Sequence, residues 1–502
     1  MGFIQKDALR TMIITYLGLL LGYLNKGILF VLILSTEEIG LINLILGVGL
    51  LFAQLSNLGT INAIAKFLPF FKDSDEKKQS FLMFNLFFVF AGILLFSSIA
   101  ILLQTQIVNF YSKKSILFVD YYYWIIPIGI GNVFFLVFET YLRSLLKNIL
   151  SVFIYEFLLR IIVTLLLTLL AFDFLNFNQF FVIHALIYFV PSLVLLIYLF
   201  KTNEINFNKN TLKISKKFRK IIFSFSFFSY SNTLGALTVM TIDSLMIAYF
   251  LGLKETGVYT TIIYLTSALQ IPYKSLTRIA NSLIPIYWKE KNLERMQDLY
   301  QKVSSVSLVI ALFMFLLVWI NRIELFSFLP NEYQIGIWIF LFLMIGRMID
   351  MYFSLNATIL VTSKKFKYDI IFTCMLLFLV FILNYWLIPI YGVVGAAIST
   401  GFAITVSNLF RMLFVFFTYK LHFFHWNQLK VLVLFLLIFL LFEFFKPIFL
   451  NKFLEIIFNS VFISVSFLGT IYFLNLEPEI KNYIKNGKKF ILTKTKLKKL
   501  KK

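Results

Sequence analysis

Long apolar runs separated by short polar segments extend along the whole chain. A helix that crosses a bilayer needs about 20 mainly apolar residues, and about 14 runs meet that requirement. They lie at residues 11–34, 41–65, 81–104, 118–141, 150–172, 179–200, 221–250, 258–286, 304–328, 334–362, 368–389, 392–418, 429–447 and 455–475. The pattern therefore predicts an all-α polytopic membrane protein with about 14 transmembrane helices.

The first apolar run follows Lys6 and Arg10, as the apolar core of a signal peptide would. It is longer than such a core, and no A-x-A cleavage site follows it. We therefore expect this segment to be retained as the first transmembrane helix.

The composition agrees with a membrane protein. Of the 502 residues, 60% are hydrophobic and only 14% are charged, and the mean hydropathy is +0.89. A soluble domain has about a quarter of its residues charged. These values exclude a soluble enzyme, a disordered protein and a nucleic-acid-binding domain. Cys374 is the only cysteine, so an intrachain disulfide is excluded as well.

The formal net charge of +22 is distributed unevenly between the loops. Most Lys and Arg residues fall in alternate loops, on the side that also holds both ends of the chain. Lys and Arg accumulate in the cytoplasmic loops of membrane proteins. The distribution predicts that both termini are cytoplasmic, which requires an even number of transmembrane helices.

A shift of 217 residues reveals a sparse internal repeat. It aligns Gly18 with Gly235, Gly40 with Gly257, Glu38 with Glu255 and Lys26 with Asp243. The repeat predicts two six-helix lobes of like orientation, with a substrate site between them. The expected parts are an N-lobe at 1–200, a basic cytoplasmic connector at 201–220, a C-lobe at 221–420, two further helices at 421–475 and a Lys-rich cytoplasmic tail at 476–502.

The Lys-rich tail (476–502) ends in KKFILTKTKLKKLKK, which mixes lysines with Phe, Ile and Leu. Lysines near a membrane surface are attracted to anionic lipid. We therefore expect the tail to lie loosely on anionic membrane lipid. A specific lipid or protein partner site is the alternative.

Several charged residues lie within the predicted membrane spans, where charges are costly and usually face a cavity or a partner. Three sets have the spacing of intrahelical ion pairs, and these are Glu156 with Arg160, Arg347 with Asp350, and Glu139 with Arg143. Each set could be a static pair that lowers the cost of insertion. Alternatively, these residues could line a transport cavity or a gate.

Lys274 and Arg278 are four residues apart in the run 258–286, so they share one helical face and repel each other. Two like charges in this position require an anion. We interpret them as a phosphate-binding pair, since cationic clusters suit phosphate groups. A carboxylate partner on another helix is the alternative.

Lys26 and Asp243 occupy equivalent positions of the repeat and carry opposite charges. The repeat axis would bring them towards each other. We expect an ion pair that closes the outer gate of a transporter. A static pair of each residue with a neighbouring helix is the alternative.

Motifs of catalysis are missing from the sequence. There is no GxxxxGK[ST] phosphate-binding loop, no HExxH and no GxSxG. His422 and His425 are too few to hold a metal by themselves. The sequence therefore predicts a transporter rather than an enzyme, with no resident cofactor, and it leaves open whether Na⁺ or H⁺ is coupled to transport.

Three segments resemble the Wzx-type polysaccharide flippases of the multidrug/oligosaccharidyl-lipid/polysaccharide (MOP) exporter superfamily. TIDSLMIAYFLGLKETGVYTTIIYLTSAL (241–269) is similar to the start of the second half of these proteins. LIPIYGVVGAAIST (387–400) is similar to their junction between helices 11 and 12, and STEEIGLINLI (35–45) to their first loop. The layout is similar over nearly the whole chain, although the motifs themselves are short.

The resemblance implies two six-helix lobes around a cationic central cavity, two extra helices and alternating access. Within it, Asp243 matches the acid of helix 7, and Lys274 and Arg278 are the residues assigned to a pyrophosphate. Lys26 is similar in place to basic residues on helix 1 of the related lipid II flippases. Those relatives usually carry a stronger basic cluster there, which argues against the lipid II branch.

The leading hypothesis is a flippase that moves undecaprenyl-pyrophosphate-linked oligosaccharide across a bacterial inner membrane for synthesis of O-antigen (a part of lipopolysaccharide), capsule or exopolysaccharide. Its partners would be the lipid-linked oligosaccharide and polysaccharide-assembly proteins, and not nucleic acid. The first alternative is a cation-coupled multidrug exporter of the same superfamily, in which Asp243, Asp350, Glu139 and Glu156 would carry the function. The second is a membrane scaffold that does not transport.

Overall fold

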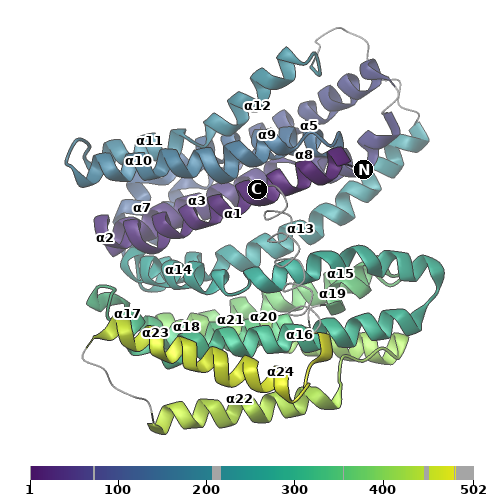
Figure 1. Cartoon of the computed structure of the whole chain (residues 1–502). Coiled ribbons are helices and arrows are strands. Elements are labelled where there is room, and N and C mark those ends of the chain that lie inside the picture. Colours follow the sequence, from purple (N-terminus) through teal and green to yellow (C-terminus); the bar gives the residue numbers. More distant parts are fainter. Residues whose placement is uncertain are drawn as a thin grey trace, which may run out of the picture. The chain divides into compact units, whose positions relative to one another are not determined.

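The computed structural model describes residues 2–71, 74–205, 216–353, 355–445, 451–479 and 481. These residues form helices and no strand, so the predicted all-α fold is confirmed (Figure 1). Within these residues, twelve helices are long and apolar enough to cross a membrane. They are Arg10–Ile33, Thr36–Ser56, Asp75–Leu102, Ile116–Ser144, Ile149–Ala171, Phe177–Lys201, Leu293–Ile320, Asn331–Tyr352, Lys367–Tyr391, Val393–Tyr419, Trp426–Phe445 and Lys452–Phe473. The chain is therefore a multi-pass membrane protein.

Twelve of the 14 predicted runs overlap these spans, and the count of 14 is not confirmed. The run 221–250 falls within a single long helix, α13 (Lys216–Phe250). The run 258–286 is divided between α14 (Leu253–Ala268) and α15 (Ile271–Glu290). Pro272 stands in the first turn of α15, where its missing N–H is tolerated, whereas it would interrupt a continuous helix.

The chain forms two compact units, which are described separately. Unit 1 consists of Met1–Tyr264 and Asn384–Val393, and unit 2 of Leu265–Leu383 and Val394–Lys502. The expected lobe boundaries at 200 and 220 do not coincide with this division, because α13 and the first part of α14 pack with the N-terminal helices. The residues 206–215 of the expected connector and 482–502 of the Lys-rich tail lie outside the described part of the chain.

Unit 1 is built from helices that run roughly side by side (Figure 1). In chain order they are α1 (Gly2–Tyr23), a π-helical turn (Leu24–Leu29), α2 (Phe30–Ile33), α3 (Thr36–Ser56), α4 (Thr60–Phe67), α5 (Asp75–Leu102), α6 (Gln104–Tyr111), α7 (Ile116–Tyr121), α8 (Ile125–Ser144), α9 (Ile149–Val152), a second π-helical turn (Phe153–Leu158), α10 (Leu159–Ala171), α11 (Phe177–Leu186), α12 (Phe189–Lys201), α13 and the first part of α14. Helix α8 is central, since α3, α4 and α12 all pack against it. Fully buried side chains such as Tyr141 and Val137 fill the space between them.

Local sequence signals explain where α3 begins. The Ser35 hydroxyl accepts from the Glu38 N–H, and the Glu38 carboxylate accepts from the Ser35 N–H at 2.8 Å. This reciprocal pair satisfies two backbone donors that the first helical turn leaves open. It separates α3 from α2 by a turn of only two residues.

Helices α3 and α14 approach each other at two glycines. A Cβ atom on Gly40 would lie 2.0 Å from the Leu253 carbonyl oxygen, and one on Gly257 would lie 1.8 Å from the Thr36 carbonyl oxygen. Only glycine permits such a contact between backbones. Beyond it, Asn43 Nδ2 donates to Thr260 Oγ1 at 3.1 Å. Gly40 and Gly257 are 217 residues apart, and so are Asn43 and Thr260, which is the shift of the internal repeat.

Unit 2 is organised around the long helix α16 (Leu293–Ile320), which packs against α15, α18, α22 and α23. Its other helices are α17 (Arg322–Phe326), α18 (Gly336–Tyr352), α19 (Leu355–Thr362), most of α20 (Lys367–Tyr391), α21 (Val393–Tyr419), α22 (Trp426–Phe445), α23 (Lys452–Ile463), a π-helical turn (Ser464–Leu468) and α24 (Gly469–Phe473). In lipid, such helices associate through close packing and polar contacts rather than through the hydrophobic effect.

The last two spans are attached to α16 and its neighbours. One face of α16, including Leu312 and Leu316, packs against Val431 of α22 and Ile463 of α23. Near the end of α16, Arg322 forms two hydrogen bonds with the Glu443 carboxylate, at 2.6 and 3.1 Å. The C-terminal helices are therefore part of the packing of unit 2.

Candidate functional site: charged side chains at membrane depth

Glu156 and Arg160 form the intrahelical ion pair that their spacing predicted, with 2.5 Å between Oε2 and Nη2. Glu156 lies in the π-helical turn Phe153–Leu158, and Arg160 opens α10. A π-helical turn leaves helical backbone groups unpaired and is common at functional sites. Here Asn25, in the other π-helical turn of unit 1, donates to the Arg160 carbonyl oxygen at 2.8 Å. The two irregular turns thus support one another.

The Arg160 guanidinium retains an unused donor. Its Nη1 atom is buried and has no hydrogen-bond partner among the described residues. Gly22 provides the space for it, because a Cβ atom there would lie 3.0 Å from Nη1 and 2.8 Å from the Tyr264 hydroxyl oxygen. A buried charged donor without a partner is costly, so this nitrogen is suited to an anion or a polar ligand.

Lys26 lies close to the same place. Its Nζ atom donates to Asn43 Oδ1 at 3.1 Å and lies 5.5 Å from the centre of the Tyr264 ring. The Tyr23 and Tyr264 rings are also in contact, with 4.9 Å between their centres. Lys26, Arg160 and Glu156 together carry one net positive charge, and aromatic rings border them. Such a group is suited to an anion attached to a flat or ring-shaped molecule.

The repeat position of Asp243 suggested an ion pair with Lys26, but the two side chains do not pair directly. Its side chain is buried, and it accepts from the Tyr259 hydroxyl and from Asn384 Nδ2, each at 2.7 Å. Two neutral donors therefore hold the Asp243 carboxylate, while Lys26 donates to an amide. Lys26 and Asp243 thus have different hydrogen-bond partners here, and their role as a gate stays a prediction.

Glu139 and Arg143 form a looser intrahelical pair near the end of α8, with 3.5 Å between Oε1 and Nη1. The Arg143 side chain is 55% exposed and that of Glu139 17% exposed. This geometry fits a helix-end pair that neutralises Glu139. The pair does not by itself indicate that either residue lines a cavity.

In unit 2, Arg347 and Asp350 each have a partner on another segment. Arg347 Nη1 donates to Gln270 Oε1 at 2.8 Å, and Asn408 Nδ2 donates to Asp350 Oδ1 at 3.1 Å. Gln270 immediately precedes α15, the helix that carries Lys274. Arg347 lies near enough to Lys274 to repel it electrostatically.

Lys274 and Arg278 both have exposed side chains on α15. Within the part of the chain that the structure describes, neither forms an ion pair with a carboxylate of unit 2. Arg347 adds a third positive charge near Lys274. The expectation that these residues bind a phosphate group therefore stays a prediction.

One buried ion pair escaped the sequence reasoning. Arg411 Nη2 lies 2.9 Å from Asp369 Oδ1, and both side chains are nearly buried, at 12% and 6% exposure. Arg411 lies within the predicted run 392–418, whereas Asp369 is the second residue of the predicted run 368–389, where a charge resembles a loop residue. The amides of Asn43, Gln270 and Asn408 were missed as well, because uncharged residues give no signal in an apolar run.

No protein-family model and no curated protein sequence matches this chain. Solved structures do match it. The lipid II flippase MurJ in an inward closed conformation superimposes with a TM-score of 0.67 and 15% identity, covering 94% of this chain and 99% of MurJ. An inward-facing multidrug resistance MATE family transporter of the MOP superfamily gives 0.57 and 15%, covering 80% and 97%.

A third match is a MOP superfamily transporter from Pyrococcus furiosus described as having a binding pocket of reverse polarity, with a TM-score of 0.55 and 17% identity over 82% of this chain and 95% of that one. At such identities the likeness concerns the fold. The chain thus shares the fold of these transporters.

Proposed function

We propose that this protein is a flippase that moves undecaprenyl-pyrophosphate-linked oligosaccharide across a bacterial inner membrane by alternating access, with both termini in the cytoplasm. The observation that carries the proposal is the cationic group of unit 1. There the buried Arg160 Nη1 atom has no partner among the described residues, and Lys26 lies beside it. The fold shared with MurJ and the MATE transporters supports a transporter.

The physical problem is the headgroup. A sugar–pyrophosphate would lose its hydrogen bonds to water in the hydrocarbon, at a cost of several kcal/mol for each unpaired polar group. Charged and hydroxyl-bearing side chains at membrane depth replace those bonds. The rings of Tyr23 and Tyr264, close to Lys26, are suited to stack on a sugar.

In this proposal the pyrophosphate binds Lys274 and Arg278, with Arg347 adding positive charge from α18. Among the described residues, Lys274 and Arg278 form no ion pair with a carboxylate of unit 2, which supports an anion from outside the protein. The lipid chain of the substrate stays in the bilayer throughout. The Lys-rich tail (476–502) binds anionic lipid, and polysaccharide-assembly proteins receive the product.

A cation-coupled multidrug exporter is the second candidate function, because a MATE transporter shares the fold, Asp243 and Asp369 are buried acids, and Asp350 is half-buried. Asp243 and Asp350 accept from amide groups and Asp369 pairs with Arg411. The Arg411 guanidinium neutralises Asp369, which removes that acid as a site for an organic cation, whereas the amide donors leave the charges of Asp243 and Asp350 in place. We assign the coupling of Na⁺ or H⁺ to Asp243, whose carboxylate accepts hydrogen bonds from the Tyr259 hydroxyl and the Asn384 amide.

The test is deletion of the gene in a host without a second flippase, followed by measurement of undecaprenyl-linked oligosaccharide and surface glycan. Wild type and the matched control Lys113→Ala/Lys114→Ala, which changes two exposed residues of the short loop between α6 and α7, should restore surface glycan. Lys274→Ala/Arg278→Ala should leave the intermediate accumulated.

Restoration by that double variant would remove the proposed pyrophosphate site and leave the flippase. Unchanged glycan in the deletion strain would overturn the flippase. The purified protein in proteoliposomes then separates the two candidates, since a flippase moves labelled lipid-linked glycan and an exporter moves ethidium.

A further inference from the structure

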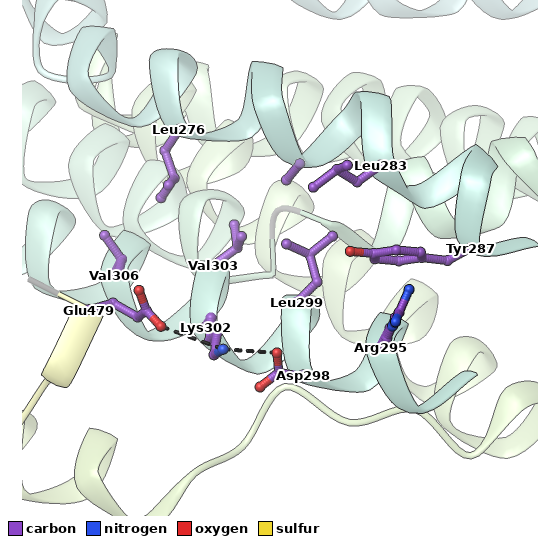
Figure 2. A pocket seen from close by; sticks show the side chains of 11 residues that line it. Leu276, Leu283, Tyr287, Arg295, Asp298, Leu299, Lys302, Val303, Val306 and Glu479 are labelled. Atoms are coloured by element: carbon purple, nitrogen blue, oxygen red, sulfur yellow. Dashed lines mark ion pairs between the residues drawn. The ribbon is translucent and has the colours of Figure 1, made fainter. Parts of the chain in front are cut away.

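A groove of about 450 Å³ runs between α15 and α16 in unit 2 (Figure 2). One face of each helix supplies its floor, and the floor is apolar. The lining apolar residues are Leu276, Ala280 and Leu283 of α15, and Leu299, Val303 and Val306 of α16. The lining residues of α15 extend from Leu276 to Tyr287, about three helical turns, so the floor is long enough for part of a hydrocarbon chain.

The rim of the groove is charged. Figure 2 shows Lys302 between Asp298 and Glu479, with Nζ–carboxylate distances of 2.9 and 3.5 Å. Arg295 stands at the other end, next to the Tyr287 ring, and its side chain is 67% exposed with the Glu290 carboxylate 3.8 Å away. The lining residues therefore comprise two cations and two carboxylates.

The rim lies where a bilayer has its headgroups. Arg295, Asp298 and Lys302 occupy the first turns of the membrane span Leu293–Ile320, while the floor continues into that span. Tyr287 and Trp288 end the neighbouring helix α15. Such aromatic residues concentrate at the interface between membrane and water.

The balance of charge decides between ligands. A purely anionic headgroup would meet Asp298 and Glu479 as well as the cations. A zwitterionic headgroup fits both signs, because Arg295 and Asp298 are three residues apart on one helix and their side chains are about 5–6 Å apart at Cβ. Arg295 offers two donors to a phosphate, and Asp298 accepts from an ammonium group.

We propose that this groove binds a membrane phospholipid with a primary-amine headgroup, a phosphatidylethanolamine. The phosphate binds Arg295, the ammonium group binds Asp298, and one acyl chain lies along the floor between α15 and α16. Glu479 holds the end of the last membrane segment against Lys302, beside the bound headgroup. The site is separate from the transport charges, so it does not depend on the proposed substrate.

The test is native mass spectrometry of the full-length protein in detergent, titrated separately with phosphatidylethanolamine, phosphatidylcholine, phosphatidylglycerol and undecaprenyl phosphate. The ethanolamine lipid should bind about tenfold or more tightly than the other three, since it alone supplies both a phosphate and an N–H donor. Asp298→Asn should remove the preference over phosphatidylcholine, and Arg295→Ala should weaken both.

Two matched controls change exposed neighbours that do not line the groove, Glu294→Gln for the acid and Lys289→Ala for the cation, and should leave binding unaltered. Leu283→Trp should block the floor and abolish the preferred binding. If its thermal unfolding shows that it is misfolded, Leu276→Trp takes its place. Equal affinity for all four lipids, tighter binding of phosphatidylglycerol or undecaprenyl phosphate, or binding that survives both tryptophans would overturn the proposal.

Discussion

Asn43 donates a hydrogen bond to Thr260, the residue 217 positions further along the chain, which is the spacing of the internal repeat. Gly40 and Gly257, related by the same shift, allow the backbones of α3 and α14 to touch at the same crossing. The contact is reciprocal, because Gly40 faces the carbonyl oxygen of Leu253 and Gly257 faces that of Thr36. Thr36 and Leu253 are themselves related by the shift of 217 residues. Equivalent segments of the two repeats thus meet about a local two-fold axis.

This crossing should tolerate no side chain. Gly40→Ala or Gly257→Ala would place a Cβ atom about 2 Å from a backbone oxygen, and backbone cannot move aside as a flexible side chain can. We expect each variant to lose about 1–3 kcal/mol of stability, measured by thermal unfolding in detergent. Gly469→Ala is the control, because a Cβ atom there meets nothing within 4 Å. Wild-type stability of both crossing variants would show that the helices are further apart.

The Glu156–Arg160 pair allows structure and function to be separated. Glu156→Gln alone should cost roughly 1–3 kcal/mol, because it leaves a partly buried guanidinium without its charged acceptor. Adding Arg160→Gln should restore most of the stability. If Arg160 binds substrate, the double variant folds but does not complement the deletion strain.

The matched control for that experiment is Asp75→Asn/Lys78→Gln, which removes an ion pair at the start of α5 whose aspartate is 83% exposed. It should complement fully. Complementation by the Glu156→Gln/Arg160→Gln variant as well would reduce this pair to a structural role and would remove the main support for an anion site in unit 1.

Burial should decide how much each ion pair of unit 2 contributes. Asp369→Asn leaves the nearly buried Arg411 charge without its partner, and we expect a loss of about 3–5 kcal/mol. Glu443→Gln breaks the more exposed pair with Arg322 and should cost at most about 1 kcal/mol. Chemical denaturation of the two variants side by side gives the comparison. Equal losses would contradict the difference in environment that the structure shows.

Glu477 predicts a pH dependence after the last membrane span. It is buried against Ser305 and near Glu479, and burial raises its pKa from 4.5 to about 7. Because the folded state favours the protonated form, the packing of residues 477–479 is most stable below pH 4.5 and weakens as the pH rises to about 7. Lys302, which pairs with Glu479, and Lys481 are the nearby cations.

Hydrogen exchange of this segment, corrected for the intrinsic pH dependence of exchange, should show greater protection at pH 5.5 than at pH 8. Glu477→Gln should protect the segment equally at both values, since a glutamine does not titrate. Greater protection of the wild type at pH 8 would reverse the sign and refute the assignment.

The sequence was informative where the signal is local. Apolar length predicted the all-α membrane fold, and the spacing of Glu156 and Arg160 predicted their pair, because both depend on residues within one helix. Long-range partners gave no such signal. Asp243 accepts a hydrogen bond from Asn384 instead of pairing with the oppositely charged Lys26, and Arg347 donates one to Gln270. An amide can form a hydrogen bond with a charged group, but an uncharged residue in an apolar run gives no signal in the sequence.

The two compact units are interleaved along the chain, because residues Asn384–Val393 belong to unit 1 although unit 2 begins at Leu265. A ribosome that has made the first 264 residues has therefore not yet supplied Asn384, the partner of Asp243. Similarly, the face of α16 that packs against α22 and α23 must stay in lipid, or be held by an insertion factor, until the last helices are made. Unit 1 is consequently completed only after a large part of unit 2 has been made, and a chain that stops before Asn384 leaves both units unfinished.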